Sequence, residues 1–450
     1  MNQMTAIQLS QALDTGKTSS VALVNTTLNE ITQKDPQLHA FIEVTSDTAI
    51  ADAEASDLRR LTGNSLSPLD GVPLAIKGNI ARQGVATTNG TRAFTNRIAI
   101  QDAFVVKRLR SAGAVIVGTL NMHEGALGAT TDNQFWGQCQ NPLAPGFTPG
   151  GSSGGSAASV AAGIIPITLG TDTMGSVRIP AAYCGLWGLK PTHGLVSNGG
   201  LSHLSWTLDT IGPIATSSDD IALALSVLAA HDPDCIDSHP APTGWTANHP
   251  SPNPEDIVMG VPEYDVLAPC EPEIRETFER LLSRIRSVGI QLVPIEISKW
   301  EPSRLRRAGL LVAEAEAAHI LGQSLDSDPT GFSDDFRAMI SYGRTAPGSK
   351  VAAAYRYIAK VRFGVCRALS GLNAIILPTA PQRAFPHGAT VPASQADFTT
   401  LANVAGLPAF SFPIPALDNG LPASVQLIGN AFSDGELIAL GNALFQVNAL

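Results

Sequence analysis

Nucleophilic chemistry is the reaction type that two glycine- and serine-rich stretches and one lysine of this sequence can support. The stretch "GGSSGGSAASVAAG" at residues 150–163 contains the adjacent serines Ser152 and Ser153, and "LGTDTMGSVRIPAAYCG" contains Ser176. A serine hydroxyl is a weak nucleophile until a nearby base removes its proton. Lys77 follows the apolar run in "PLAIKGN", where full burial would lower its pKa by as much as ~3–5 units and make it such a base. The alternative is a lysine whose ammonium group extends from the strand end into solvent.

Other functions of the run at residues 150–163 remain open, although the flanking sequence lacks what each one requires. A flexible linker would join independent domains, whereas this run leads directly into an alanine-rich, helix-forming segment. A phosphate-binding loop would need GxxxxGK followed by Ser or Thr, or a strand followed by GxGxxG. The GxSxG matches at Ser152 and Ser153 would suit a Ser–His–Asp hydrolase if a strand preceded them and a histidine partner followed. Turn-forming residues precede them instead.

The turn around Ser176 has the composition of an oxyanion hole. Gly175 and Ser176 follow the apolar segment "IIPITL", which we predict to be a strand, and Pro180 ends the turn. Small residues here allow backbone N–H groups to approach a carbonyl oxygen closely, and losing one such donor costs ~3–4 kcal/mol of transition-state stabilisation. The lysine, the serines and this turn together favour acyl-transfer chemistry.

The elements that must position these residues alternate between helices and strands. Short apolar strands are predicted at residues 72–76, at residues 115–117 and in "IIPITLG", with helical spacing between them. Such alternation predicts an α/β fold with a mixed β-sheet core covered by helices on both faces. We expect one domain over residues 1–450, with a mainly helical excursion at about residues 265–370.

The composition argues against several classes of protein. Hydrophobic residues make up 44% of the 450 residues and charged residues 15%, so the chain can bury a large core. The net charge of −10 argues against nucleic acid or an anionic membrane surface as the main partner. The five scattered cysteines favour free thiols in a reducing compartment over disulfides or a zinc site. Because no signal-peptide pattern or membrane-spanning apolar run is present, we expect a soluble, cytoplasmic protein, and we expect no cofactor and no metal.

Residues 149–192, "PGGSSGGSAASVAAGIIPITLGTDTMGSVRIPAAYCGLWGLKPT", resemble the signature of the amidase signature family. "DGVPLAIKGNI" resembles the segment that carries the family's lysine, and "LDTIGPIA" and "ANVAGLPAFSFPIP" resemble its flanking and C-terminal segments. The likeness extends from about residue 5 to 445 and implies the amidase signature fold and a Ser–cisSer–Lys triad. It implies Lys77 as the base, Ser152 as the cis-serine bridge and Ser176 as the nucleophile.

The resemblance also implies roles for residues around the triad. Backbone amides of the loop that contains the nucleophile are implied as the oxyanion hole: Thr173, Met174, Gly175 and Ser176. Ser153 matches a supporting position without a chemical step of its own. The segment "MHEGALGATTDNQFWG" matches one wall of the family's substrate pocket, which implies that Gly125 and Ala126 contact the substrate.

Met174 and Gly78 depart from the family's pattern, and the role of the Asp172–Arg178 pair has two interpretations. Met174 stands where a glycine is often found, and its thioether either protrudes toward the pocket or packs behind it. Gly78 stands where many relatives carry Asp, which removes a charge near Lys77. Asp172 and Arg178 are expected to orient the nucleophile turn as a pair, although an ordinary structural ion pair explains them equally well.

The resemblance implies an amidohydrolase that cleaves a C–N bond of a small or aryl amide, with carbamates and esters as further substrates of the same chemistry. One alternative is the glutaminase subunit of a tRNA-dependent amidotransferase, which carries a glutamine-binding Asp seven residues before the Asn of the "ANVAGLP" motif. This chain has Ala396 there, followed by Asp397. A non-catalytic binding protein on the same fold is a second alternative. The expected partner is a small-molecule amide, with no nucleic acid and no membrane, and a homodimer remains one option for the assembly.

Overall fold

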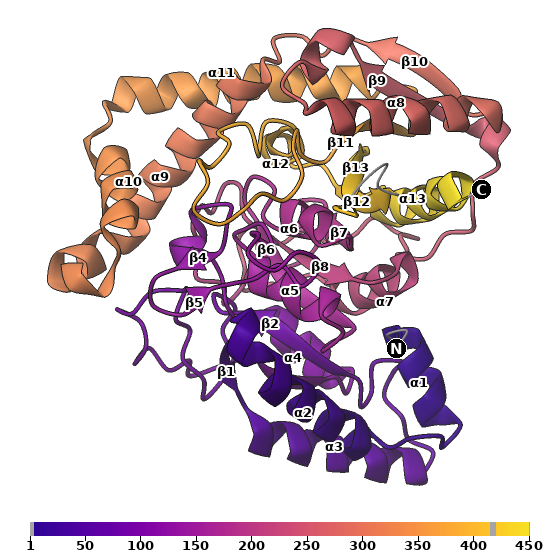
Figure 1. Cartoon of the computed structure of the whole chain (residues 1–450), viewed down its shortest axis with the longest axis vertical. Helices are drawn as coiled ribbons and strands as arrows, with labels where there is room; N and C mark the ends of the chain where they lie inside the picture. The colour runs from indigo at the N-terminus through magenta and orange to yellow at the C-terminus, as the bar shows by residue number, and fades with distance from the viewer. Residues whose placement is uncertain (1–3, 415–419, 450) are drawn as a thin grey trace.

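A large mixed β-sheet runs through the molecule (Figure 1). The structure, a computed structural model, describes residues 4–414 and 420–449, so the expected domain limits at residues 1 and 450 lie outside it. In the described chain the sheet has eleven strands in the order β1-β3-β2-β6-β8-β7-β12-β13-β11-β9-β10. The strands are β1 Phe41–Val44, β2 Pro73–Lys77, β3 Val115–Leu120, β6 Ile167–Asp172, β7 Trp187–Lys190, β8 Thr210–Ala215, β9 Val258–Pro262, β10 Gln291–Ile295, β11 Ala374–Pro378, β12 Ala409–Ile414 and β13 Ala423–Ile428. A separate hairpin pairs β4 Asp132–Asn133 with β5 Gly137–Gln138.

The sheet combines parallel and antiparallel pairs, as predicted. β2 pairs in parallel with β3 and with β6, whereas β8 pairs antiparallel to β6 and to β7. Every residue of β2, β3, β6 and β8 is buried, which explains the apolar runs that predicted strands at residues 72–76, at residues 115–117 and in "IIPITLG". The predicted mixed α/β sheet is therefore confirmed.

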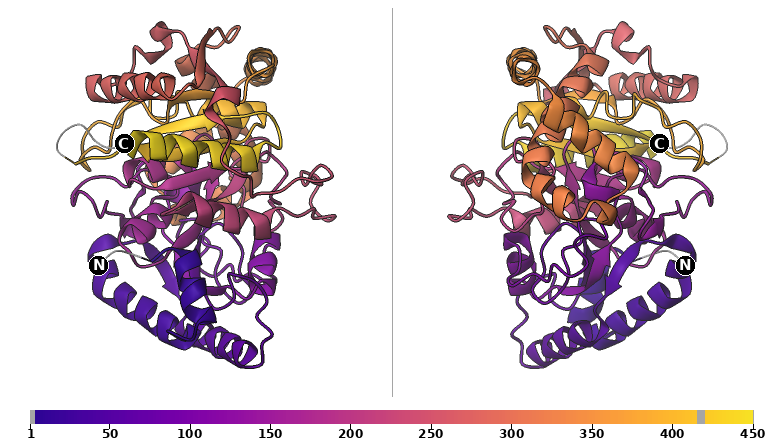
Figure 2. Two further views of the ribbon diagram at one scale, coloured as in Figure 1. Left: turned by 90° about the vertical axis from the view of Figure 1, so that its right-hand side faces the viewer. Right: turned by 90° about the vertical axis from the view of Figure 1, so that its left-hand side faces the viewer.

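Helices flank the sheet along its whole width, as the two side views in Figure 2 show. Their bounds are α1 Ala6–Asp14, α2 Ser20–Leu38, α3 Ser46–Leu61, α4 Phe104–Ser111, α5 Gly154–Ala161, α6 Arg178–Tyr183, α7 Ser218–Leu228, α8 Pro272–Ser287, α9 Pro302–Ser327, α10 Asp334–Thr345, α11 Gly348–Ala368, α12 Thr400–Ala405 and α13 Asp434–Ala449. α2 packs against β2 and β3, α5 against β2, β6 and β8, and α13 against β12 and β13. Among the described residues no helix is long and apolar enough to cross a membrane.

The parallel pairing of β2 and β6 decides where the chemistry-bearing residues meet. Ile76 of β2 lies opposite Leu169 of β6. Because parallel strands point the same way, the residues that end both strands gather at one edge of the sheet. The end of β2 and the loop after β6 therefore form one face of the site.

The helical excursion differs in one respect from its sequence pattern. The excursion expected at about residues 265–370 contains α9, α10 and α11, and α10 was not recognised as a separate helix. Its N-cap is Ser333, whose hydroxyl accepts a hydrogen bond from the N–H of Phe336 at 3.1 Å. α9 and α10 project together at the left of Figure 1, and α9 passes over the pocket described below.

Candidate active site

Lys77 is the last residue of β2, and its side chain is fully buried. Its Nζ donates to three hydroxyl oxygens: Ser152 Oγ at 2.8 Å, Ser153 Oγ at 2.9 Å and Thr171 Oγ1 at 2.8 Å. Thr171 reaches the lysine because it lies near the end of the neighbouring strand β6. The lysine therefore does not extend into solvent. A neutral amine in this position would donate two of the three hydrogen bonds and accept the third.

Burial lowers the pKa of Lys77 from its ordinary value of 10.5 to about 7, because the surrounding protein disfavours the charged ammonium. The carboxylates of Asp209 and Asp172 oppose part of this effect. Gly78 supplies no carboxylate, and a Cβ atom added there would lie 2.7 Å from Cδ1 of Ile42. The amine is thus neutral in a large fraction of molecules near pH 7, which is the state that a general base requires.

The serine pair lies between Lys77 and the start of α5. The peptide bond between Gly151 and Ser152 is cis. Ser153 Oγ accepts from Lys77 Nζ and donates to the carbonyl oxygen of Thr171 at 3.1 Å, so this hydroxyl fixes the lysine to β6. The chain before the pair consists of turns and not of a strand. The strand-to-helix elbow of a Ser–His–Asp hydrolase is therefore not formed here.

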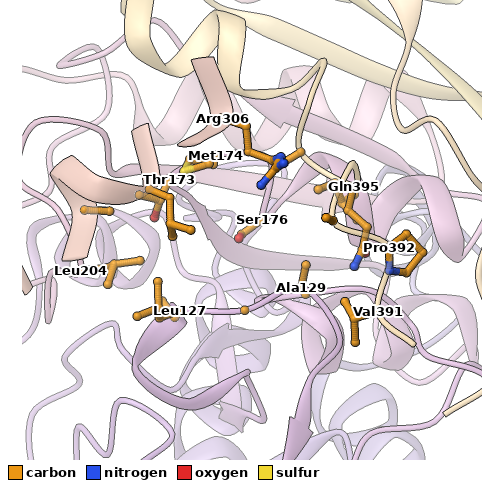
Figure 3. A pocket seen from close by; sticks show the side chains of 18 residues that line it. Leu127, Ala129, Thr173, Met174, Ser176, Leu204, Arg306, Val391, Pro392 and Gln395 are labelled. Atoms are coloured by element: carbon orange, nitrogen blue, oxygen red, sulfur yellow. The ribbon is translucent and has the colours of Figure 1, made fainter. Parts of the chain in front are cut away.

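Ser176 lies in the loop after β6, is half-buried and lines a pocket (Figure 3). Its carbonyl oxygen accepts from the N–H of Ser153 at 3.3 Å, which holds this loop against the serine pair. Its hydroxyl forms no hydrogen bond with any residue that the structure describes, so a Ser152–Ser176 hydrogen bond is not formed in this state. Catalytic hydrogen bonds are often long until the substrate binds.

The backbone amides around Ser176 divide into two groups. The N–H of Gly175 donates to Asp172 Oδ1 at 2.7 Å and is therefore engaged within the loop. The N–H groups of Thr173, Met174 and Ser176 have no partner among the described residues, and all three residues line the pocket. Three of the four amides that the sequence suggested for an oxyanion hole are available, and that of Gly175 is not.

A buried ion pair holds the backbone of this loop. Arg178 Nε and Nη2 donate to the two carboxylate oxygens of Asp172 at 3.0 Å each, and both side chains are fully buried. Burial acts to raise the pKa of Asp172, yet the charge and hydrogen bonds of Arg178 and a hydrogen bond from Asn403 outweigh it and lower the pKa to about 2. Asn403 Nδ2 donates to Asp172 Oδ1 at 2.9 Å, and Thr399 Oγ1 donates to the carbonyl oxygen of Met174 at 2.6 Å. The expected Asp172–Arg178 pair therefore exists, and Asp172 also accepts from the backbone N–H groups of Gly175 and Val177 on either side of Ser176.

Asp209 is a site residue that the sequence analysis missed. Its Oδ1 accepts from Thr173 Oγ1 at 2.6 Å, and its Oδ2 accepts from the N–H groups of Leu204 and Ser205 at 2.9 and 3.1 Å. It holds the loop through Thr173, and its charge acts to raise the pKa of Lys77. The signal that could have revealed it is its place in "LDTIGPIA", and Asn403 lies likewise in "ANVAGLP".

A cavity of about 220 Å³ opens beside Ser176 (Figure 3). Its walls are mostly apolar and include Leu127, Leu310 and Val391. Met174 lines it too, and its Sδ lies beside α9, 3.5 Å from the place of a Cβ atom on Gly309. A cavity of this size suits a small substrate with one or two polar groups.

The two residues predicted to contact the substrate occupy different places. Ala126 lines the pocket. Gly125 does not: it lies behind the wall, where a Cβ atom would overlap the ring of Phe336 at 2.2 Å from Cε2. Its N–H donates to the carbonyl oxygen of Asn89 at 2.9 Å. Gly125 therefore permits close packing of α10 against the wall, and the sequence did not distinguish this role from substrate contact.

The opposite side of the pocket comes from α9 and from the segment before α12, which lie far from the signature in sequence. Arg306 and Gln395 supply polar groups there, and Ala396 lines the pocket as well. Asp397 does not line it, and its Oδ1 accepts from Arg306 Nε at 2.7 Å. The sequence analysis missed Arg306 because the α9 sequence has no recognisable motif.

Metal-ligating side chains are not grouped at this site. Within residues 4–414 and 420–449, no three or more His, Cys, Asp or Glu side chains lie close enough together to hold a metal ion.

The geometry agrees with what comparison with known proteins finds. A family model described as Amidase matches residues 22–438. A glutamyl-tRNA(Gln) amidotransferase subunit from Roseiflexus sp. is 37% identical to this chain over 478 residues, covering 99% of the chain and 97% of the relative.

Two solved structures show the same architecture. A crystal structure of an amidase superposes with a TM-score of 0.88 at 30% identity, covering 98% of this chain and 99% of the other. A bacterial aryl acylamidase of the amidase signature enzymes superposes with a TM-score of 0.91 at 23% identity, covering 100% of this chain and 97% of the other. At that identity the second match concerns the fold alone.

Proposed function

Because the chain belongs to the amidase signature family and is an amide-hydrolysing enzyme, we propose that it cleaves a small or aryl amide through an acyl-enzyme on Ser176. In this proposal Lys77 is the general base and Ser152 relays protons between the lysine and the nucleophile. The observation that carries it is the fully buried amine of Lys77, 2.8 Å from Ser152 Oγ and beside the pocket that Ser176 lines.

The first half of the reaction acylates Ser176. Neutral Lys77 takes the proton of Ser152 Oγ while Ser152 Oγ takes the proton of Ser176 Oγ. The Ser176 oxygen then forms a bond with the carbonyl carbon, and the carbonyl electron pair moves to oxygen. The protonated lysine returns its proton to Ser152, which passes one to the leaving nitrogen as the C–N bond breaks. The products are the free amine and an ester of Ser176.

The backbone amides stabilise the oxyanion of the tetrahedral intermediate. The free N–H groups of Thr173, Met174 and Ser176 are the donors in this proposal, while that of Gly175 keeps the loop in shape through Asp172. Each donor of this kind contributes ~3–4 kcal/mol to transition-state stabilisation, because it points at the charge without having to reorganise.

The second half hydrolyses the ester. A water molecule gives a proton to the Ser152–Lys77 relay and attacks the acyl carbon. The bond between that carbon and Ser176 Oγ breaks, Ser176 regains its proton through Ser152, and the acid leaves. Carbamates and esters present the same kind of acyl carbon, so they are further substrates within this proposal.

A substrate panel with a matched nucleophile variant tests the proposal. Aryl amides, short aliphatic amides, carbamates and glutamine are assayed by released amine or ammonia, with the wild type and Ser176→Ala. A fluorophosphonate probe followed by peptide mapping reports which serine is reactive. The proposal expects turnover and an adduct on Ser176 that the variant loses. A well-folded protein without turnover or adduct would support a binding role instead.

A second candidate function, the glutaminase of a tRNA-dependent amidotransferase, is favoured by the 37% identity to the Roseiflexus protein. It requires recognition of glutamine, including its α-ammonium group. Ala396 occupies the position expected for the recognising carboxylate, and Asp397 is paired with Arg306 outside the pocket lining. Glutamine as the best substrate in the panel would support this candidate over the free-standing amidase.

A further inference from the structure

Arg306 is the one charged side chain among the described residues that line the active-site pocket. It comes from α9, and in Figure 3 its guanidinium group is directed toward the middle of the view, where Ser176 lies. The remaining walls are largely apolar. A single positive group that faces a serine hydroxyl across a small apolar cavity favours a negatively charged ligand between them.

Asp397 holds Arg306 in place without using its terminal nitrogens. Arg306 Nε donates to Asp397 Oδ1 at 2.7 Å, and the Arg306 side chain is 16% exposed against 3% for Asp397. The Nη1 and Nη2 groups have no hydrogen-bond partner among the described residues. Because the hydrogen bond from Nε to Asp397 fixes the orientation of the guanidinium group, Nη1 and Nη2 point in a fixed direction. Both can donate to a planar group with two oxygen atoms, such as a carboxylate.

Gln395 adds a further donor beside Arg306. Its side chain is buried, and its Oε1 accepts from the hydroxyl of Tyr183 at 3.1 Å. The same hydroxyl accepts from Gln382 Nε2 at 2.7 Å, so its proton is free to point at Gln395 and fixes the amide orientation. Gln395 Nε2 has no hydrogen-bond partner among the described residues. Both residues thus offer donors and no acceptor to the pocket.

We propose, on the basis of the amidase function above, that Arg306 and Gln395 form a carboxylate subsite and that the natural substrate is an amide carrying a carboxylate. The Arg306 guanidinium would bind the two carboxylate oxygens, and Gln395 Nε2 would donate to one of them. None of the described residues that line the pocket carries a carboxylate, so an α-ammonium group would find no charged partner among them. A deaminated analogue of glutamine therefore fits this pocket better than glutamine.

Matched amide pairs test the subsite. Glutaramate and pentanamide differ only in a terminal carboxylate against a methyl group, and ammonia release gives kcat/KM for each. For the wild type we expect the ratio of kcat/KM for glutaramate to that for pentanamide to exceed one. We expect Arg306→Gln to lower this ratio about 10- to 100-fold, because hydrogen bonds to a charged group are lost. Arg306→Lys should retain part of the preference for glutaramate. Arg307→Gln, which changes the adjacent exposed arginine, should retain all of this preference.

A second pair of amides shows on which side of the amide bond the carboxylate binds, and a comparison with glutamine tests whether an α-ammonium group is recognised. N-Acetylglycine and N-ethylacetamide carry the same difference on the leaving-group side, so the pair with the larger Arg306 dependence shows on which side the carboxylate binds. Glutamine differs from glutaramate only in its α-ammonium group. Ratios that are unchanged in Arg306→Gln for both pairs would overturn the subsite. A higher kcat/KM for glutamine than for glutaramate would overturn the preference for a substrate without an α-ammonium group.

Labelling of Ser176 separates a failed subsite from a failed amidase function. Glutarate should slow fluorophosphonate labelling of Ser176 in the wild type and in Arg307→Gln, and it should not do so in Arg306→Gln. Normal labelling that glutarate does not slow contradicts the subsite alone. Absence of labelling in the folded wild type contradicts the proposed amidase function. Circular dichroism of each variant establishes that the folds are intact.

Discussion

Lys77 Nζ lies 2.8 Å from Ser152 Oγ, and neither side chain is exposed to solvent. Burial lowers the pKa of the lysine to about 7, which suits the proposed role of Lys77 as the base, and the contact places its amine beside Ser152. The remaining proton transfer, between Ser152 and Ser176, connects the buried hydroxyl cluster around Lys77 with the pocket. The account therefore depends on a buried lysine acting on a pocket serine through an intermediate hydroxyl.

Removal of the base should abolish most of the activity without unfolding the chain. We expect Lys77→Ala to lower kcat by about 10²- to 10⁴-fold, the range that general base catalysis contributes. Steady-state kinetics with an aryl amide gives kcat, and thermal unfolding followed by circular dichroism checks the fold. A folded variant with near-native rates would exclude Lys77 as the base.

The activity should rise with pH through the pKa of Lys77. The lysine is active as the neutral amine, and because burial lowers its pKa from 10.5 to about 7, the neutral fraction increases as the pH passes from about 6 to about 8. The pH profile of kcat/KM measures this for the free enzyme. Lys190 is a matched control, because its pKa is also lowered to about 7 although it does not line the pocket. Lys190→Met should keep the profile, and a profile that is flat in the wild type would contradict the assignment.

The two adjacent serines should contribute unequally. In the proposed mechanism Ser152 relays protons, whereas Ser153, which binds Lys77 Nζ and the Thr171 carbonyl oxygen, carries out no chemical step. We expect Ser152→Ala to lower kcat by about 10²-fold or more and Ser153→Ala to lower it less while shifting the pH midpoint. Parallel pH profiles of both variants make the comparison, and equal losses with unshifted midpoints would speak against the division of roles.

Crowding at Gly175 should disable the nucleophile loop. Gly175 has φ of 130°, and a Cβ atom there would lie 2.3 Å from Thr399 Oγ1. Gly175→Ala must therefore displace the amides beside Ser176, and we expect a loss on the order of 10²-fold in kcat. Gly244→Ala is the control, since it also has positive φ but open space around it. The control should retain kcat, and equal activity of both variants would show that loop position does not matter.

The buried Asp172–Arg178 pair should contribute to stability as well as to loop geometry. Asp172→Asn leaves the fully buried Arg178 without its charge partner, which costs about 3–5 kcal/mol of unfolding free energy. Urea unfolding measures the change. Asp326→Asn breaks an exposed pair with Arg344 and should leave the unfolding midpoint nearly unchanged. A similar midpoint for both variants would contradict a structural role of the buried pair.

Local patterns in the sequence were sufficient to predict the mixed sheet and to single out Lys77 and the serines as candidate site residues. The apolar run before Lys77 predicted β2 but left the burial of the amine open, and the acidic–basic spacing around Ser176 predicted the Asp172–Arg178 contact. These features depend on residues that are neighbours in sequence or lie on one strand, so a short stretch of sequence is enough to predict them.

Features that depend on distant segments were not predictable in the same way. Arg306 reaches the pocket from α9, and its role depends on Asp397, which lies 91 residues away in sequence. Gly125 was expected at the substrate, but Phe336 of the unrecognised α10 occupies the space beside it. The engagement of the Gly175 N–H by Asp172 required the loop conformation itself.

The most direct test of the central claim is the rate of fluorophosphonate labelling at Ser176 as a function of pH, with the adduct located by peptide mapping. The account predicts labelling at Ser176 that increases with a midpoint near pH 7, the pKa of Lys77, and that is lost in Lys77→Ala and Ser152→Ala. Labelling at another serine, or labelling of Ser176 at an undiminished rate in Lys77→Ala, would contradict it.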